Sequence, residues 1–129
     1  MRRTYRSVKR DGVGFEVLGG TLRITSHAYD AGPVHLSRED LALLGLAVRP
    51  CAQQASASAV KLWREAARQA CGELPRCPTP WSSPGITAGD MRLVAVEEGL
   101  DVFVLTYEAP PIEVQLTELE KLGVCCSAR

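Results

Sequence analysis

The residues of this sequence that could carry out catalysis do not form a recognisable pattern. Nucleophilic catalysis requires a nucleophile and a base that meet in space. The short Gly12-Val13-Gly14 segment precedes a strand-like stretch, unlike a phosphate-binding loop, and no nucleophile elbow is present. Candidate nucleophiles and bases are scattered along the chain, at His27, Asp30, His35, Cys77, Ser82 and Ser83. We therefore expect no catalytic residue and no cofactor, and we keep an enzyme whose site is assembled only in three dimensions as a third hypothesis.

The cysteines and histidines lack the spacing of a structural metal site. Zinc sites usually contain cysteines separated by roughly two to four residues. Five residues separate Cys71 from Cys77, and Cys125 and Cys126 are adjacent. We therefore expect no metal. An odd number of cysteines, five, is also awkward for the paired disulfides of a secreted framework, which favours a cytoplasmic protein.

The N-terminus is a basic arm on an acidic body. The first ten residues contain five basic side chains and no acid, namely Arg2, Arg3, Arg6, Lys9 and Arg10. From Asp90 to Glu120 there are eight acids and a single base, Arg92. Such an arm can contact nucleic-acid phosphates through charge alone, which gives the second hypothesis, a nucleic-acid-binding protein. The alternative is that the arm lies against the acidic part of the chain or is solvated, and no helix-turn-helix, zinc-finger or RNA-binding-sheet signature is present.

Trp81 is the best candidate for an anchor that holds a partner protein. It lies in a segment with prolines at positions 75, 78, 80 and 84, and an exposed tryptophan is favoured at interfaces. The Pro75-x-x-Pro78 spacing also resembles ligands of aromatic-lined grooves. The alternative is that Trp81 fixes its own loop onto the core. Together with the acidic hairpin that follows, the candidate partner-binding residues are Trp81, Glu97, Glu98, Asp101, Phe103, Leu105 and Tyr107.

Alternating apolar and polar residues predict the hairpin that precedes the first helix. Val13 to Leu18 and Thr21 to Ser26 are the strands, and Gly19-Gly20 is a two-residue turn, which glycine favours because it tolerates positive φ. A short helix should follow the N-cap Ser37 and end at Gly45 in the left-handed conformation.

A second hairpin is predicted from Met91 to Glu97 and from Leu100 to Tyr107. The second of these strands is apolar on both faces, so it should be covered on both sides or form half of an interface, and a homodimer is one way to do so. Thr117 and Glu120 predict a capping box for the last short helix.

The two hairpin regions resemble each other at an offset of 78 residues. Residues 22–46 and 100–124 align without gaps with seven identities in 25 positions, including Pro33 with Pro111 and Gly45 with Gly123. The shared positions are those that turn, cap and bury the chain, which indicates a shared scaffold. The alternative is two unrelated units of similar composition.

These patterns predict a single α+β domain. Two pseudo-repeated units, each a ββ-hairpin plus a short helix, would span about residues 13–46 and 91–124. A linking region of about 50–88 would contain a long Ala-rich helix, from about Cys51 to Cys71 and packed across the sheet or sheets, and then the Pro-rich bridge.

No function class is marked strongly by the composition. The hydrophobic fraction is 46% and the charged fraction 23%, both ordinary for a globular protein. No apolar run approaches the roughly 20 residues of a membrane helix, and no signal-peptide pattern follows the basic N-terminus. We expect a cytoplasmic protein-interaction module without chemistry of its own, such as an inhibitor, an adaptor or a regulatory subunit.

Overall fold

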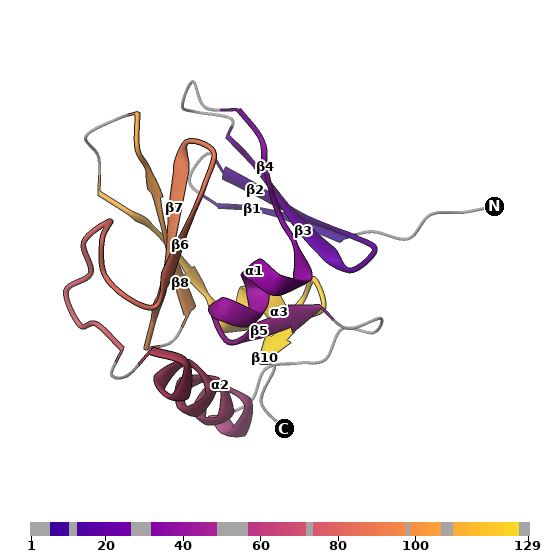
Figure 1. Cartoon of the computed structure of the whole chain (residues 1–129). Helices are drawn as coiled ribbons and strands as arrows, with labels where there is room; N and C mark the ends of the chain where they lie inside the picture. Colours follow the sequence, from indigo (N-terminus) through magenta and orange to yellow (C-terminus); the bar gives the residue numbers. More distant parts are fainter. Residues whose placement is uncertain are drawn as a thin grey trace.

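The computed structural model belongs to the α+β class, as predicted (Figure 1). It describes residues 6–10, 13–26, 32–48, 57–71, 74–97, 99–106 and 110–126. Within these ranges there are two four-stranded antiparallel sheets, one two-stranded sheet and three helices. No helix in the described ranges is long and apolar enough to cross a membrane.

The first sheet has the strand order β1-β2-β3-β4, and all neighbours are antiparallel. The predicted hairpin around Gly19-Gly20 is confirmed, and Gly19 has φ +64°. The elements of this half of the chain are β1 Arg6–Arg10, β2 Val13–Leu18, β3 Thr21–Ser26, β4 Val34–Leu36, α1 Arg38–Leu43 and β5 Leu46–Val48.

The second sheet has the order β6-β7-β8-β9 and is also antiparallel throughout. Its elements are β6 Gly85–Ala88, β7 Met91–Val96, β8 Gly99–Val104 and β9 Ile112–Gln115, followed by α3 Leu116–Glu120 and β10 Val124–Cys126. Each of β2, β3, β4, α1 and β5 begins 78 residues before its counterpart in this half. β6 was not predicted, because Pro84 directly before it had marked the segment as a loop.

The caps of the two short helices decide where these helices begin and end. The Asp40 N–H donates to Ser37 Oγ and the Ser37 N–H donates to Asp40 Oδ2, both at 3.1 Å, which confirms the predicted N-cap. Gly45 follows the helix with φ +78°, as predicted. The capping box predicted at Thr117 and Glu120 is wrong.

Helix α3 begins one residue before Thr117, because its N-cap lies further upstream than the sequence pattern indicated. The N-cap is Gln115, whose backbone N–H donates to Glu118 Oε1 at 3.1 Å. Two residue pairs with the spacing of a capping box are present, Gln115 with Glu118 and Thr117 with Glu120. Only the first pair, directly after strand β9, forms the cap.

One hydrophobic cluster contains side chains from both four-stranded sheets and from all three helices. Its fully buried side chains include Phe15, Leu22, Leu93 and Leu100. The burial of each such side chain contributes about 1.5–3 kcal/mol to the stability of the fold. β5 and β10, which the sequence did not predict, pair antiparallel and join the ends of the two halves. Three residues are too few to show a strand periodicity.

Helix α2 spans Ala57–Cys71. The expectation of a long Ala-rich helix across the sheets is not supported: residues 51–56 lie outside the described residues, and the helix lies at one end of the molecule against β10 (Figure 1). Among the residues of this helix whose burial is described, Trp63 and Ala67 are buried, whereas Leu62 is 48% exposed. The short β5–β10 ribbon, not a broad sheet, is the surface that this helix covers.

Candidate interaction surface

The outer face of the second sheet is partly covered by the proline-rich segment, residues 74–84. Val94 and Phe103 lie on this face and are 0% and 7% exposed, yet neither belongs to the main hydrophobic cluster. The Ala95 N–H donates to the Pro84 carbonyl at 2.8 Å, which ties the end of the segment to strand β7. The apolar outer face of β8 is therefore buried within one chain, as a central strand covered on both sides.

Arg92 on β7 holds the segment in place. Its Nε donates to the Pro80 carbonyl at 2.6 Å and one of its terminal nitrogens donates to the Ser82 carbonyl at 3.3 Å. The other terminal nitrogen donates to Thr87 Oγ1 at 3.1 Å. The single base in the acidic stretch thus binds loop carbonyls, and its guanidinium lies 5.7 Å from the centroid of the Trp81 ring.

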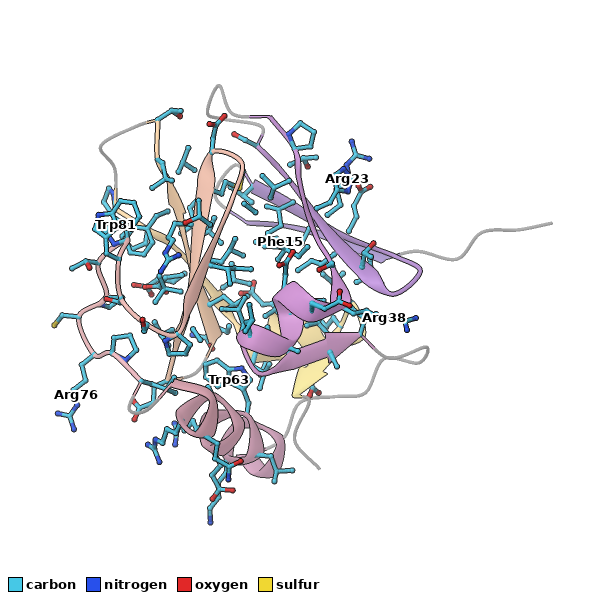
Figure 2. The ribbon with its side chains drawn as sticks, in the orientation of Figure 1. Phe15, Arg23, Arg38, Trp63, Arg76 and Trp81 are labelled. Atoms are coloured by element: carbon cyan, nitrogen blue, oxygen red, sulfur yellow. The ribbon has the colours of Figure 1, made fainter. Side chains whose placement is uncertain are left out.

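Trp81 stands at the tip of a tight turn formed by residues 79–82. The Ser82 N–H donates to the Thr79 carbonyl at 3.1 Å, and the Thr79 N–H donates to Ser82 Oγ at 2.8 Å. The Trp81 N–H donates to Thr79 Oγ1 at 3.3 Å. Pro80 precedes Trp81, at a turn position where its fixed φ is favourable. The Trp81 side chain is 70% exposed and lies on the outer side of the second sheet (Figure 2).

A pocket of about 560 Å³ lies where the first residues of the segment meet strands β8 and β9. Arg64 on α2 donates from Nε to the Glu97 carbonyl at 3.0 Å, which anchors the turn at one edge of this pocket. The residues that line it are Pro75, Arg76, Pro78, Val96, Glu97, Gly99, Asp101, Glu113, Val114 and Gln115. The lining is acidic, with three carboxyl groups and one guanidinium.

Asp101 is the most unusual residue of this pocket. It is only 5% exposed and stands opposite Glu113 on the neighbouring strand. Burial raises the pKa of the Asp101 carboxyl from 3.8 to about 6, and the negative charge of Glu113 adds to the rise. The pocket can therefore hold or release a proton near neutral pH.

The position of the first sheet that corresponds to Asp101 is Arg23, and the cross-strand row of residues around it has a different chemistry. There Arg23 stands opposite Glu16 on β2 and His35 on β4, and an Arg23 terminal nitrogen lies 3.7 Å from Glu16 Oε1. The residues 78 positions later in this row are Val94, Asp101 and Glu113. At these positions the first sheet thus carries a pair of opposite charges, and the second sheet carries a buried acid beside a pocket.

The predicted partner-binding residues are divided by this arrangement. Trp81 and Leu105 are exposed, at 70% and 38%, and Glu97 lies at the pocket. Asp101 is inside the pocket and Phe103 is buried on the outer face, so Phe103 is not available as a surface contact. Glu98 and Tyr107 lie outside the described residues.

The residues predicted to bind nucleic acid are only partly placed. Arg2 and Arg3 lie outside the described residues. Arg6, Lys9 and Arg10 belong to β1, which is an edge strand paired with β2. The predicted basic arm therefore forms a strand from Arg6 to Arg10.

Sequence reasoning missed Arg92 and Glu113, which complete the surface. The isolation of Arg92 among eight acids was a usable signal, because a single base in an acidic stretch indicates that its side chain has a specific partner. Glu113 carried no signal, since its importance follows only from its register with Asp101.

No family model, curated protein or solved structure matches this chain. In the described part of the chain, no group of three or more histidine, cysteine, aspartate and glutamate residues could hold a metal ion.

Proposed function

We propose that this protein is a small non-catalytic interaction module that binds another protein through the turn that carries Trp81. The observation behind the proposal is a tryptophan that is 70% exposed on a turn fixed by backbone and side-chain hydrogen bonds. Tryptophan is one of the residue types enriched among those that dominate binding energy at interfaces. An inhibitor, an adaptor and a regulatory subunit are the roles that such a module performs.

The fixed geometry of the turn of residues 79–82 favours a role for Trp81 in binding a partner. A loop that is already ordered loses little conformational entropy when a partner binds. Arg92 and Thr79 hold the turn in place by hydrogen bonds while the Trp81 side chain stays 70% exposed. This exposure supports a surface role for Trp81 over the alternative that it fixes its own loop to the core. The neighbouring acids favour a partner with a basic surface.

The experiment is an affinity capture with three forms of the chain: wild type, Trp81→Ala and Leu43→Ala. Leu43 is a matched control, since it is an exposed apolar side chain, at 58%, on helix α1. A protein recovered by wild type and by Leu43→Ala but lost with Trp81→Ala supports the proposal, once the purified pair shows the same dependence. Equal recovery by all three forms, or no specific protein, contradicts it.

We also propose that the two halves of the chain are copies of one ancestral unit. The support is that five elements begin 78 residues before their counterparts, in the same order and with equivalent strand pairing. Expression of residues 1–49 and 79–129 as separate chains tests this idea. Separately purified halves that associate in equimolar amounts support two equivalent units, and halves that do not associate count against it.

An enzyme remains the alternative that one observation favours. A carboxyl with a pKa near 6 beside a second carboxylate in a pocket is an arrangement found at acid–base sites. If the chain is an enzyme, Asp101 and Glu113 are the candidate proton donor and acceptor. Loss of activity in Asp101→Asn, with Trp81→Ala fully active, separates this alternative from the interaction module.

The nucleic-acid alternative depends on the basic N-terminus. Binding through Arg2, Arg3 and Arg6 predicts a steep loss of affinity with salt and loss of binding when all three are changed to alanine. Affinity retained by that triple variant excludes this mode of binding.

A further inference from the structure

Asp101 brings to the pocket a carboxyl group for which the described residues supply no hydrogen-bond donor and no counter-ion. Asp101 lines the pocket, and only 5% of its surface is exposed. Among the residues that the structure describes, it makes no hydrogen bond or ion pair, and its only electrostatic neighbour is the carboxylate of Glu113. A buried acid normally has a hydrogen-bond donor or a counter-ion, so the missing partner points to a ligand.

The geometry of the two strands makes the pair an acceptor for a cation. Asp101 and Glu113 are direct cross-strand partners, and in such pairs the Cβ atoms lie about 4.5–5.5 Å apart. Like charges in this position repel each other, which destabilises the empty site. A cation placed between the two carboxylates removes the repulsion and gains two charge-assisted hydrogen bonds.

The chain's own base at this pocket does not fill the role. Arg76 lines the rim, but its side chain is exposed and points away from the sheet (Figure 2). It forms no ion pair within the described ranges. Three acidic residues therefore line the pocket, and among the described residues Arg76 pairs with none of them.

The size and walls of the pocket fit an organic cation better than a metal ion. The volume is about 560 Å³, many times that of a single ion. Pro75, Pro78 and Val96 supply apolar lining, so an aliphatic stem can pack against them while its charged end meets the acids. A planar guanidinium matches two adjacent carboxylates best, because it donates in a fixed fork.

We propose that this pocket binds a guanidinium or primary ammonium group between Asp101 and Glu113, with its aliphatic stem against Pro75 and Pro78. The group is carried either by a free small molecule or by an arginine or lysine side chain of another protein. This site goes beyond the interaction proposed for Trp81, which does not line the pocket.

The test is an NMR titration of the ¹⁵N-labelled chain with three probes. These are agmatine, the peptide acetyl-Gly-Arg-Gly-amide, and the same peptide with citrulline in place of arginine. We expect both guanidinium probes to shift the backbone amides of Gly99, Asp101 and Gln115, and the neutral citrulline peptide to shift none. Tighter binding of agmatine indicates a free small molecule, and tighter binding of the arginine peptide indicates a protein side chain.

Variants of the pocket locate the binding and keep the test independent of folding. Glu113→Gln changes an exposed residue and Asp101→Asn keeps the shape of the side chain, and each should weaken the guanidinium probes by at least about ten-fold. Arg76→Ala removes the nearby positive charge and should strengthen binding. The control Glu39→Gln, an exposed acid on α1, should change nothing.

The ionisation of Asp101 makes probe binding dependent on pH. Glu113 stands opposite Asp101, and Glu97 and Arg76 also line the pocket. Ionisation of Asp101 should strengthen probe binding as the pH rises from 5 to 7. The proposal is overturned if neither guanidinium probe shifts these amides up to roughly 10 mM, if citrulline binds equally, or if both pocket variants bind as wild type. Trp81→Ala should leave probe binding unchanged, which separates this result from that of the affinity capture.

Discussion

The guanidinium of Arg92 lies 5.7 Å from the centroid of the Trp81 ring, while its nitrogens hold the backbone of the same turn. One side chain thus fixes the loop and supports the exposed ring. The relationship explains how a residue with 70% of its surface in water can keep a defined position.

Removal of this support should loosen the turn before it unfolds the sheet. Arg92→Ala loses three hydrogen bonds from a charged donor and should lower the free energy of unfolding by about 2 kcal/mol. Arg92→Lys keeps the charge but not the fork, so about half of that loss is expected. Urea unfolding followed by the fluorescence of buried Trp63 measures both, and a loss below about 0.5 kcal/mol for Arg92→Ala contradicts the role.

Asp101 should make stability fall as the pH rises. Its folded pKa of about 6 lies above the unfolded value of 3.8, so the folded chain binds the proton more tightly and loses this advantage between about pH 4 and 6. The full effect is about 3 kcal/mol at most. Asp101→Asn should therefore stabilise the chain at pH 8 and change little at pH 3.5, as measured by urea unfolding at both values. A variant with the same pH profile as wild type is the contrary outcome.

The neighbouring carboxylate should contribute part of that pKa rise. Glu113→Gln removes a negative charge opposite Asp101 and should lower the Asp101 pKa, though not to 3.8, because burial is the larger cause. NMR titration of the Asp101 side-chain carboxyl carbon gives the value directly. An unchanged pKa in Glu113→Gln means that the two side chains do not interact.

Gly99 should not tolerate a side chain. A Cβ at this position meets the Val114 carbonyl oxygen at 2.0 Å, and backbone atoms of β9 cannot move without breaking the strand pairing. Gly99→Ala should cost about 3 kcal/mol or more in unfolding free energy. Gly32→Ala is the matched control, since a Cβ there has nothing within 4 Å, and it should lie within about 0.5 kcal/mol of wild type.

The two helix caps should differ in a way that the sequence pattern does not show. Ser37→Ala removes the bond from the Asp40 N–H and should cost about 1 kcal/mol. Thr117→Ala should cost little, because Thr117 lies inside helix α3 and does not cap it. Thermal unfolding of both variants checks the pair, and an equal loss in the two would restore the cap predicted from sequence.

Much of the local structure followed from the sequence alone. Alternation placed β2 and β3, because each has a buried inner face and period-two patterning over six residues. β7 and most of β8 were predicted as an apolar hairpin, and β8 is buried at all six positions. Gly19 and Gly45 marked a turn and a helix end, since positive φ favours glycine. These features depend on neighbours within a few positions along the chain.

Only the tertiary structure decided where the segments come together. The three-residue strands β5 and β10 are too short for a periodicity, and their pairing joins residues 46–48 to 124–126. The sequence could not place residues 74–84 on the outer face, because this depends on hydrogen bonds from Arg92 to Pro80 and Ser82. Asp101 looked like a surface acid until the register with Glu113 and the cover of that face made it a buried one. Burial and register are properties of packing between distant residues, and a sequence pattern records only what lies nearby.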